Sequence, residues 1–214
     1  MAELRTEEEQ LDAIKRWWKE NGTSLIAGVA IAVAGVVGWN AWQNYQENQA
    51  QSASMRYQHL VSLTDGGNID EARSLVVEIT DNHGRTLYAD LARLIDARLA
   101  VDTGDLDEAQ RVLEGVIDSS NREYVQGLAR LRLARLQIAE GNAETALDTL
   151  ARDIPAALAA QQADLRGDAM KALGREDEAR QAWQEALAVA EQRDQPIYGV
   201  QLKLDDLGAE EVSL

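Results

Sequence analysis

One ten-residue phrase recurs in four versions along this chain: GNIDEARSLV (67–76), GDLDEAQRVL (104–113), GNAETALDTL (141–150) and GREDEARQAW (174–183). Successive copies begin 37, 37 and 33 residues apart. Periods of this length are typical of stacked helical hairpins, in which each hairpin buries its apolar face against the next. The phrase therefore predicts an all-α fold built as a helical-repeat solenoid.

The residue types within the phrase suit a helical hairpin. The leading glycine can adopt the left-handed conformation that ends a helix, and the polar residue after it, as at Asn68, Asp105 and Asn142, is suited to capping the next helix. An alanine five positions after the glycine lets two helices approach closely. These alanines are Ala72, Ala109, Ala146 and Ala179, and the larger residues expected behind them are Leu75, Leu113, Leu150 and Trp183.

The segments that precede the later glycines are expected to form the first helix of each pair. Residues 88–101, 124–139 and 161–173 carry leucine, alanine and isoleucine at intervals of three and four. In a solenoid, such helices line an extended concave surface. The residues predicted to line this groove are Leu91, Leu94, Arg98, Val101, Leu128, Leu131, Arg135, Ile138, Asp164, Asp168 and Lys171.

The predicted groove has two interpretations, and the sequence leaves both open. An apolar groove edged by Arg98 and Arg135 suits an extended peptide whose carboxylates or backbone oxygens the two arginines bind. Alternatively, the C-terminal tail (196–214) packs into the groove and the arginines pair with neighbouring acids.

A second feature is an uncharged stretch from residue 21 to residue 46, which contains LIAGVAIAVAGVVGW at 25–39. A helix over 23–42 would span about 30 Å, the hydrocarbon thickness of a bilayer. Aromatic rings, which prefer the membrane interface, flank it at Trp17, Trp18, Trp39, Trp42 and Tyr45. We therefore predict a single transmembrane helix at 23–42.

Nearby cations predict the orientation of this helix. Lys15, Arg16 and Lys19 precede it, and the first cation after it is Arg56. The positive-inside rule then makes 1–22 a cytoplasmic segment and 43–214 a domain outside the cytoplasm. A cleaved signal peptide is disfavoured because the stretch ends in tryptophans and not at a small-residue cleavage site. A buried helix of a protein without a membrane span is the other alternative.

Small residues gather on one face of the predicted span. Ala27, Ala30, Ala34 and Gly38 lie on the same side of a helix. Such a face lets a partner helix pack closely within the membrane. Alternatively, these residues only reflect the high frequency of alanine and glycine in membrane helices.

Composition argues against several functions. Cysteine is absent, which excludes disulfides, thiol catalysis and Cys-based zinc sites, and His59 and His83 lie in different repeats. Acidic residues outnumber basic ones by 37 to 21, so nucleic-acid phosphates would be repelled. The glycines form no phosphate-binding loop. We therefore expect a binding protein that is not an enzyme and holds no metal or cofactor.

The repeat resembles the tetratricopeptide repeat. Small residues stand seven positions before three of the helix-ending glycines, at Ala97, Ala134 and Gly167. The order of small residue, helix-ending glycine and small residue is the order found in that family. The 37-residue period and the absence of a proline between repeats depart from it, so the repeats are described as lengthened and degenerate.

The whole chain resembles the YfgM family of bacterial inner-membrane proteins. The resemblance rests on EEEQLDAIKRWWKENG (7–22), GWNAW (38–42), RLRLARLQ (130–137), ADLRGDA (163–169) and ARQAW (179–183). It implies an ancillary subunit of the SecYEG translocon in the inner membrane, with a cytoplasmic N-terminus and a periplasmic tetratricopeptide-like domain. The partners it implies are SecYEG, the periplasmic chaperone PpiD and exported unfolded proteins.

Two other functions remain as alternatives. One is a structural scaffold or assembly factor of a different envelope complex. The other is a stress-response regulator that acts through residues 1–20, where Leu4, Leu11, Ile14 and Trp18 form a helical stripe beside acidic residues.

Overall fold

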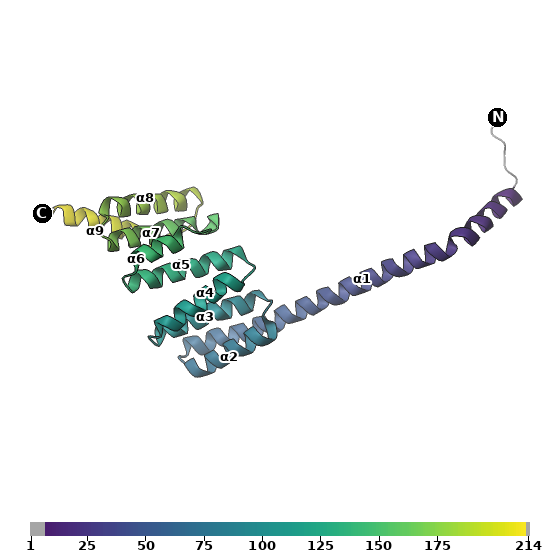
Figure 1. The fold of residues 1–214 in the computed structure, drawn as a ribbon, viewed down its shortest axis with the longest axis horizontal. Coiled ribbons are helices and arrows are strands. Elements are labelled where there is room, and N and C mark those ends of the chain that lie inside the picture. The colour runs from purple at the N-terminus through teal and green to yellow at the C-terminus, as the bar shows by residue number, and fades with distance from the viewer. Residues whose placement is uncertain (1–6, 213–214) are drawn as a thin grey trace, which may run out of the picture. The chain divides into compact units, whose positions relative to one another are not determined.

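The computed structural model describes residues 7–212, and the regular secondary structure of this part is all helix, with no strand (Figure 1). The elements are α1 (Glu7–Asp65), α2 (Ile69–His83), α3 (Leu87–Asp102), α4 (Leu106–Ser119), α5 (Glu123–Ala139), α6 (Ala143–Leu150), the short 3-10 helix η1 (Ala156–Leu158), α7 (Ala159–Ala172), α8 (Glu176–Gln192) and α9 (Val200–Val212). The predicted all-α class is confirmed. The chain divides into two compact units, Met1–Gln51 and Ser52–Leu214.

The first unit consists of the N-terminal part of α1. Its apolar side chains are exposed, Ile31 by 74% and Val37 by 62%, and no described residue covers them. Among the described residues, one helix is long and apolar enough to cross a membrane, and it is this one. Trp18 and Trp39 lie 21 residues apart, which is about 31 Å along a helix and matches the hydrocarbon thickness of a bilayer.

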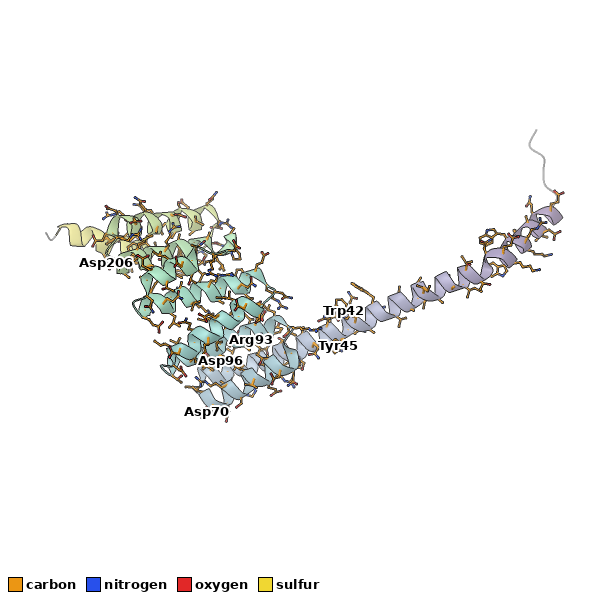
Figure 2. The ribbon with its side chains drawn as sticks, in the orientation of Figure 1. Trp42, Tyr45, Asp70, Arg93, Asp96 and Asp206 are labelled. Carbon is orange, nitrogen blue, oxygen red and sulfur yellow. The ribbon has the colours of Figure 1, made fainter. Side chains whose placement is uncertain are left out.

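The aromatic residues that flank the apolar stretch are also exposed. Trp42 and Tyr45 project from the helix (Figure 2), and the rings of Trp39 and Trp42 lie 5.3 Å apart. On the other side, Trp17 and Trp18 are each about half exposed. Amphipathic rings at both ends of an apolar helix are the arrangement expected at the two interfaces of a bilayer.

The second unit is a stack of helical hairpins. Gly67, Gly104, Gly141 and Gly174 all have a positive φ, between 73° and 83°. At each, the backbone N–H of the next residue donates to a carbonyl five residues back, as from Asp105 to Ala100 at 2.8 Å. This bond satisfies a carbonyl at the end of the helix and reverses the chain. The phrase in the sequence therefore marks four hairpin turns.

Alanines at the predicted positions sit at the helix contacts. Ala72, Ala109, Ala146 and Ala179 are all fully buried. The larger residues expected behind them are almost fully buried as well: Leu75, Leu113, Leu150 and Trp183. The expected capping is found at Asp105, whose side chain accepts from the N–H of Glu108 at 3.1 Å. Asn68 and Asn142 make no such side-chain bond.

Each end of the stack is completed by a helix outside the four phrases. At the first end, Leu60 of α1 packs in one cluster with Ile79 of α2 and Leu99 of α3. At the other end, Val200 and Leu207 of α9 pack against Trp183 of α8. The apolar faces of the terminal hairpins are thereby covered, as a short solenoid requires.

Gly167 in α7 allows the closest helix contact in the stack. A Cβ built at this position would collide with Cδ1 and Nε1 of Trp183 and would lie 2.9 Å from its Cε2. Trp183 is 1% exposed and cannot move aside into solvent. The glycine is thus required by the tryptophan of the following helix, because only a residue without a side chain fits.

We predict that Gly167→Ala destabilises the protein by about 1–3 kcal/mol, the usual effect of overpacking a core, although alanine favours a helix. The matched control is Gly115→Ala in α4, where a Cβ would meet nothing within 4 Å. The control should be neutral or stabilising by up to about 1 kcal/mol. Urea unfolding of the full chain in a mild detergent, followed by circular dichroism, measures both. Equal effects of the two variants would refute the packing argument.

Candidate interaction site

An open pocket lies between α3 and α5. Its volume is about 320 Å³. Three of its side chains are almost fully buried and form an apolar floor: Ala97 of α3, Leu113 of α4 and Leu136 of α5. The full lining is Ala97, Arg98, Val101, Leu113, Arg132, Arg135, Leu136 and Ala139.

Arg132 is the best-anchored cation of the pocket. Its Nη1 donates to the backbone carbonyl of Leu94 at 3.0 Å, which joins α5 to α3. Burial is the largest cause that lowers the pKa of Arg132, and the positive charges of Arg135 and Arg98 lower it further. The guanidinium stays charged at physiological pH. Arg132 is nevertheless exposed, as are Arg98 and Arg135, so the three cations converge at a surface that water reaches.

The other two cations are held less firmly. Nε of Arg98 lies 3.6 Å from Oδ2 of Asp102, and both side chains are at least half exposed. Such a surface pair contributes little energy. Arg135 is exposed, and its charge reaches as far as Asp164 of α7, where it opposes the rise in pKa that burial causes. Both arginines are therefore available to a ligand.

The pocket contains only part of the groove predicted from the sequence. Arg98, Val101 and Arg135 line it. Leu94 and Leu131, at 2% and 5% exposure, lie instead in the apolar clusters between helices. Neighbouring helices cover the N-terminal half of each predicted stripe, so these two residues are corrected from groove lining to core.

Three more predicted groove residues also support the core. Leu91 and Leu128 pack, partly buried, against the cluster that holds Leu94. Ile138 packs, also partly buried, against the cluster that holds Leu131. None of the three lines the pocket, so in this structure they hold the helices together.

The predicted acidic end of the groove is occupied by the chain itself. Nζ of Lys203 in α9 lies 2.6 Å from Oδ1 of Asp164 and 2.6 Å from Oδ1 of Asp168, both in α7. The same Nζ lies 5.7 Å from the ring centroid of Trp183, whose Nε1 donates to the backbone carbonyl of Asp164 at 3.2 Å. Lys171 lines a smaller hollow of about 310 Å³ beside them.

The interpretation in which the C-terminal tail packs into the groove thus fits the α7 end, and the peptide interpretation stays a prediction for the other end. At α7, the C-terminal helix supplies the ligand group, an ammonium between two carboxylates. Between α3 and α5, the lining of the pocket contains no residue of α9. The tail closes one end of the groove and leaves the other open.

Sequence reasoning missed several residues of this site. Arg132 had a visible signal, since it stands three positions before Arg135 and shares its helix face. Leu113 and Leu136 form the floor, but their spacing indicates only core. Lys203 had no signal in the sequence, because its partners lie 35 and 39 residues away.

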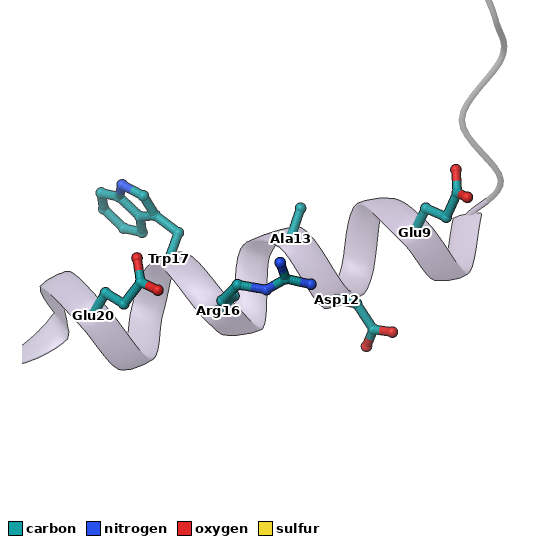
Figure 3. Close-up of a pocket in the computed structure, with 6 residues that line it drawn as sticks. All are labelled: Glu9, Asp12, Ala13, Arg16, Trp17 and Glu20. Atoms are coloured by element: carbon teal, nitrogen blue, oxygen red, sulfur yellow. The ribbon is translucent and has the colours of Figure 1, made fainter.

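In the first unit, the predicted small-residue face carries no partner within the described residues. Ala27, Ala30, Ala34 and Gly38 are exposed on α1. Nearer the N-terminus, Glu9, Asp12, Arg16 and Trp17 surround a shallow hollow (Figure 3). A single helix provides all of its walls, so it is not an enclosed site. Of the predicted regulatory stripe, Leu4 lies outside the described residues.

Comparisons with known proteins agree with this geometry. Residues 15–209 match the family described as Tetratricopeptide repeat-like domain. The chain belongs to this family. A protein of Escherichia coli named Ancillary SecYEG translocon subunit is 34% identical over 178 residues, which cover 83% of this chain and 85% of that protein.

Two further relatives carry the same name. The protein of Haemophilus influenzae is 32% identical over 103 residues, and that of Aggregatibacter actinomycetemcomitans is 37% identical over 102 residues. Each alignment covers 48% of this chain and 50% of the relative. The resemblance to a family of ancillary translocon subunits is confirmed.

Family membership also decides the class of function. Tetratricopeptide-like domains are protein-interaction folds, so the chain is a binding protein and not an enzyme. The one apolar helix near the N-terminus fits an inner-membrane protein.

The ion pairs of Lys203 lead to a pH-dependent prediction. Burial raises the pKa of Asp164, and the hydrogen bond from Lys203 is the main opposing cause. In Lys203→Met that pKa rises further, so the ionised form of the partly buried Asp164 carboxylate is penalised at neutral pH. We expect the melting temperature to fall by roughly 3–8 °C at pH 7.

The difference in melting temperature between Lys203→Met and the wild type should shrink as the pH falls through the pKa of Asp164, because a protonated carboxyl carries no charge for the ammonium to pair with. At about pH 3 little of it should remain. Thermal unfolding of the full chain in detergent tests this, with Arg152→Met, which removes a cation from an exposed position, as the control. A difference that is constant with pH would show that Lys203 acts by packing alone.

Proposed function

We propose that this chain is an ancillary subunit of the SecYEG translocon that binds other proteins at the outer side of the inner membrane. The observation that carries the proposal is the combination of one apolar helix with a tetratricopeptide-like domain in a chain whose relatives carry that name. The helix anchors the chain, and the repeat domain supplies the binding surface.

The orientation belongs to the proposal as well. Lys15, Arg16 and Lys19 stand before the apolar stretch, and no cation follows it until Arg56. This asymmetry supports a cytoplasmic N-terminal segment at 1–22, a span at 23–42 and a periplasmic domain at 43–214.

The proposed partners outside the membrane are the chaperone PpiD and exported unfolded proteins. The support for PpiD is the resemblance to the YfgM family. The support for unfolded clients is physical, since an open groove with an apolar floor and flanking arginines accepts extended chain more readily than a folded surface. Contact with the translocon itself is assigned to α1, where the face of Ala27, Ala30, Ala34 and Gly38 permits close helix packing.

This function is tested by crosslinking in living bacteria, followed by isolation of the full chain from native membranes and mass spectrometry. We expect SecYEG subunits, with PpiD and exported chains, to be recovered with the wild type. Replacing 23–42 by a leucine span of the same length should keep the anchor but reduce the recovery of SecYEG, because large side chains prevent close helix packing.

A different result would favour a different function. Recovery of another envelope complex in place of SecYEG would support the scaffold alternative. Recovery of neither the translocon nor a chaperone nor exported chains would refute the proposal.

A further inference from the structure

The pocket between α3 and α5 concentrates positive charge in an acidic chain. The chain has a formal net charge of −16, yet Arg98, Arg132 and Arg135 all border one cavity. These guanidiniums lie close enough to repel one another, since the charges of Arg135 and Arg98 both add to the lowering of the Arg132 pKa that burial begins. A bound anion would relieve this repulsion, so the charge pattern favours a negatively charged ligand.

The apolar floor favours a ligand that carries an aliphatic group as well as a negative charge. Leu113, Leu136 and Ala97 lie beneath the arginines, and Val101 and Ala139 stand at the sides. Burying these surfaces requires an aliphatic group from the ligand. A cavity of about 320 Å³ is at the small end of ligand pockets, so it accepts one or two side chains and not a folded surface.

The neighbouring α7 site provides an internal comparison. There the groove presents two carboxylates, and the chain fills the place with its own cation, Lys203. Between α3 and α5 the groove presents cations, and α9 contributes nothing to the lining. Arg98 has only an exposed, weak pair with Asp102, and the pocket lining itself contains no acid, so the complementary group at this second place is an acid supplied from outside.

We infer that the pocket between α3 and α5 binds an acidic, aliphatic peptide segment of a partner protein. One or more carboxylates of the segment pair with Arg98, Arg132 and Arg135. A leucine, isoleucine or valine beside them rests on Leu113 and Leu136. This inference rests on the proposed function in one respect, namely that the ligand is a protein. It adds which kinds of side chain that ligand must carry.

The test uses the purified full chain in lipid nanodiscs and a fluorescein-labelled peptide, Gly-Glu-Leu-Glu-Glu-Leu-Glu-Gly, with binding followed by fluorescence anisotropy. We expect saturable binding that weakens as salt is raised from about 50 to 500 mM. The double variant Arg98→Met/Arg135→Met should weaken binding roughly tenfold or more, since charge-assisted hydrogen bonds are lost. These two side chains are exposed, so their removal should leave the helical content unchanged.

Matched controls separate this inference from general charge attraction. Arg111→Met in α4 removes an exposed arginine outside the pocket and should leave binding unchanged. A peptide with glutamine in place of glutamate, and one with glycine in place of leucine, should each bind at least roughly tenfold more weakly.

Three results would overturn the inference: equal binding by the double variant, equal binding of either altered peptide, or self-association of the chain that the double variant abolishes. The last result would make a second copy the occupant. Because no translocon is present, failure here would leave the proposed function standing, and failure to recover SecYEG from membranes would leave this inference standing.

Discussion

The stack depends on a backbone constraint repeated four times, a glycine in the left-handed conformation at the end of a helix. Each such turn closes with a bond to a carbonyl five residues back, and it brings the next helix against the one just completed. Alanines five positions later let the two helices pack closely. Since the turn recurs at nearly constant spacing, successive hairpins stack in one sense, and α5 contacts both α3 and α7.

The groove is chemically divided along its length. At α7, two partly buried carboxylates are paired with a cation, which α9 supplies through Lys203. Between α3 and α5, three arginines border an apolar floor that α9 does not reach. A short solenoid must cover its last hairpin, and the helix that does so also decides which part of the groove remains open. Packing at the C-terminal end therefore also determines which part of this face stays uncovered.

Local patterns predicted most of the fold but only part of the site. The glycines, the alanines and the uncharged stretch each act within a few residues, so their roles follow from spacing alone. The pocket depends on which side of α3 and α5 stays uncovered. Leu94 and Leu131 share the periodicity of Arg98 and Arg135, yet neighbouring helices bury them. Lys203 contacts Asp164, which lies 39 residues away in the sequence. Helical periodicity does not predict a contact over that separation.

We propose that one helix holds this repeat domain outside the cytoplasm. Because the chain contains no cysteine, single substitutions give clean labelling sites at two exposed positions, Ala13→Cys in α1 and Asp148→Cys in α6. Cells with a permeabilised outer membrane are treated with a membrane-impermeant maleimide. If the repeat domain lies outside the cytoplasm, the Asp148→Cys protein is labelled at once and the Ala13→Cys protein is labelled only after the inner membrane is lysed. Labelling in the opposite order would contradict it.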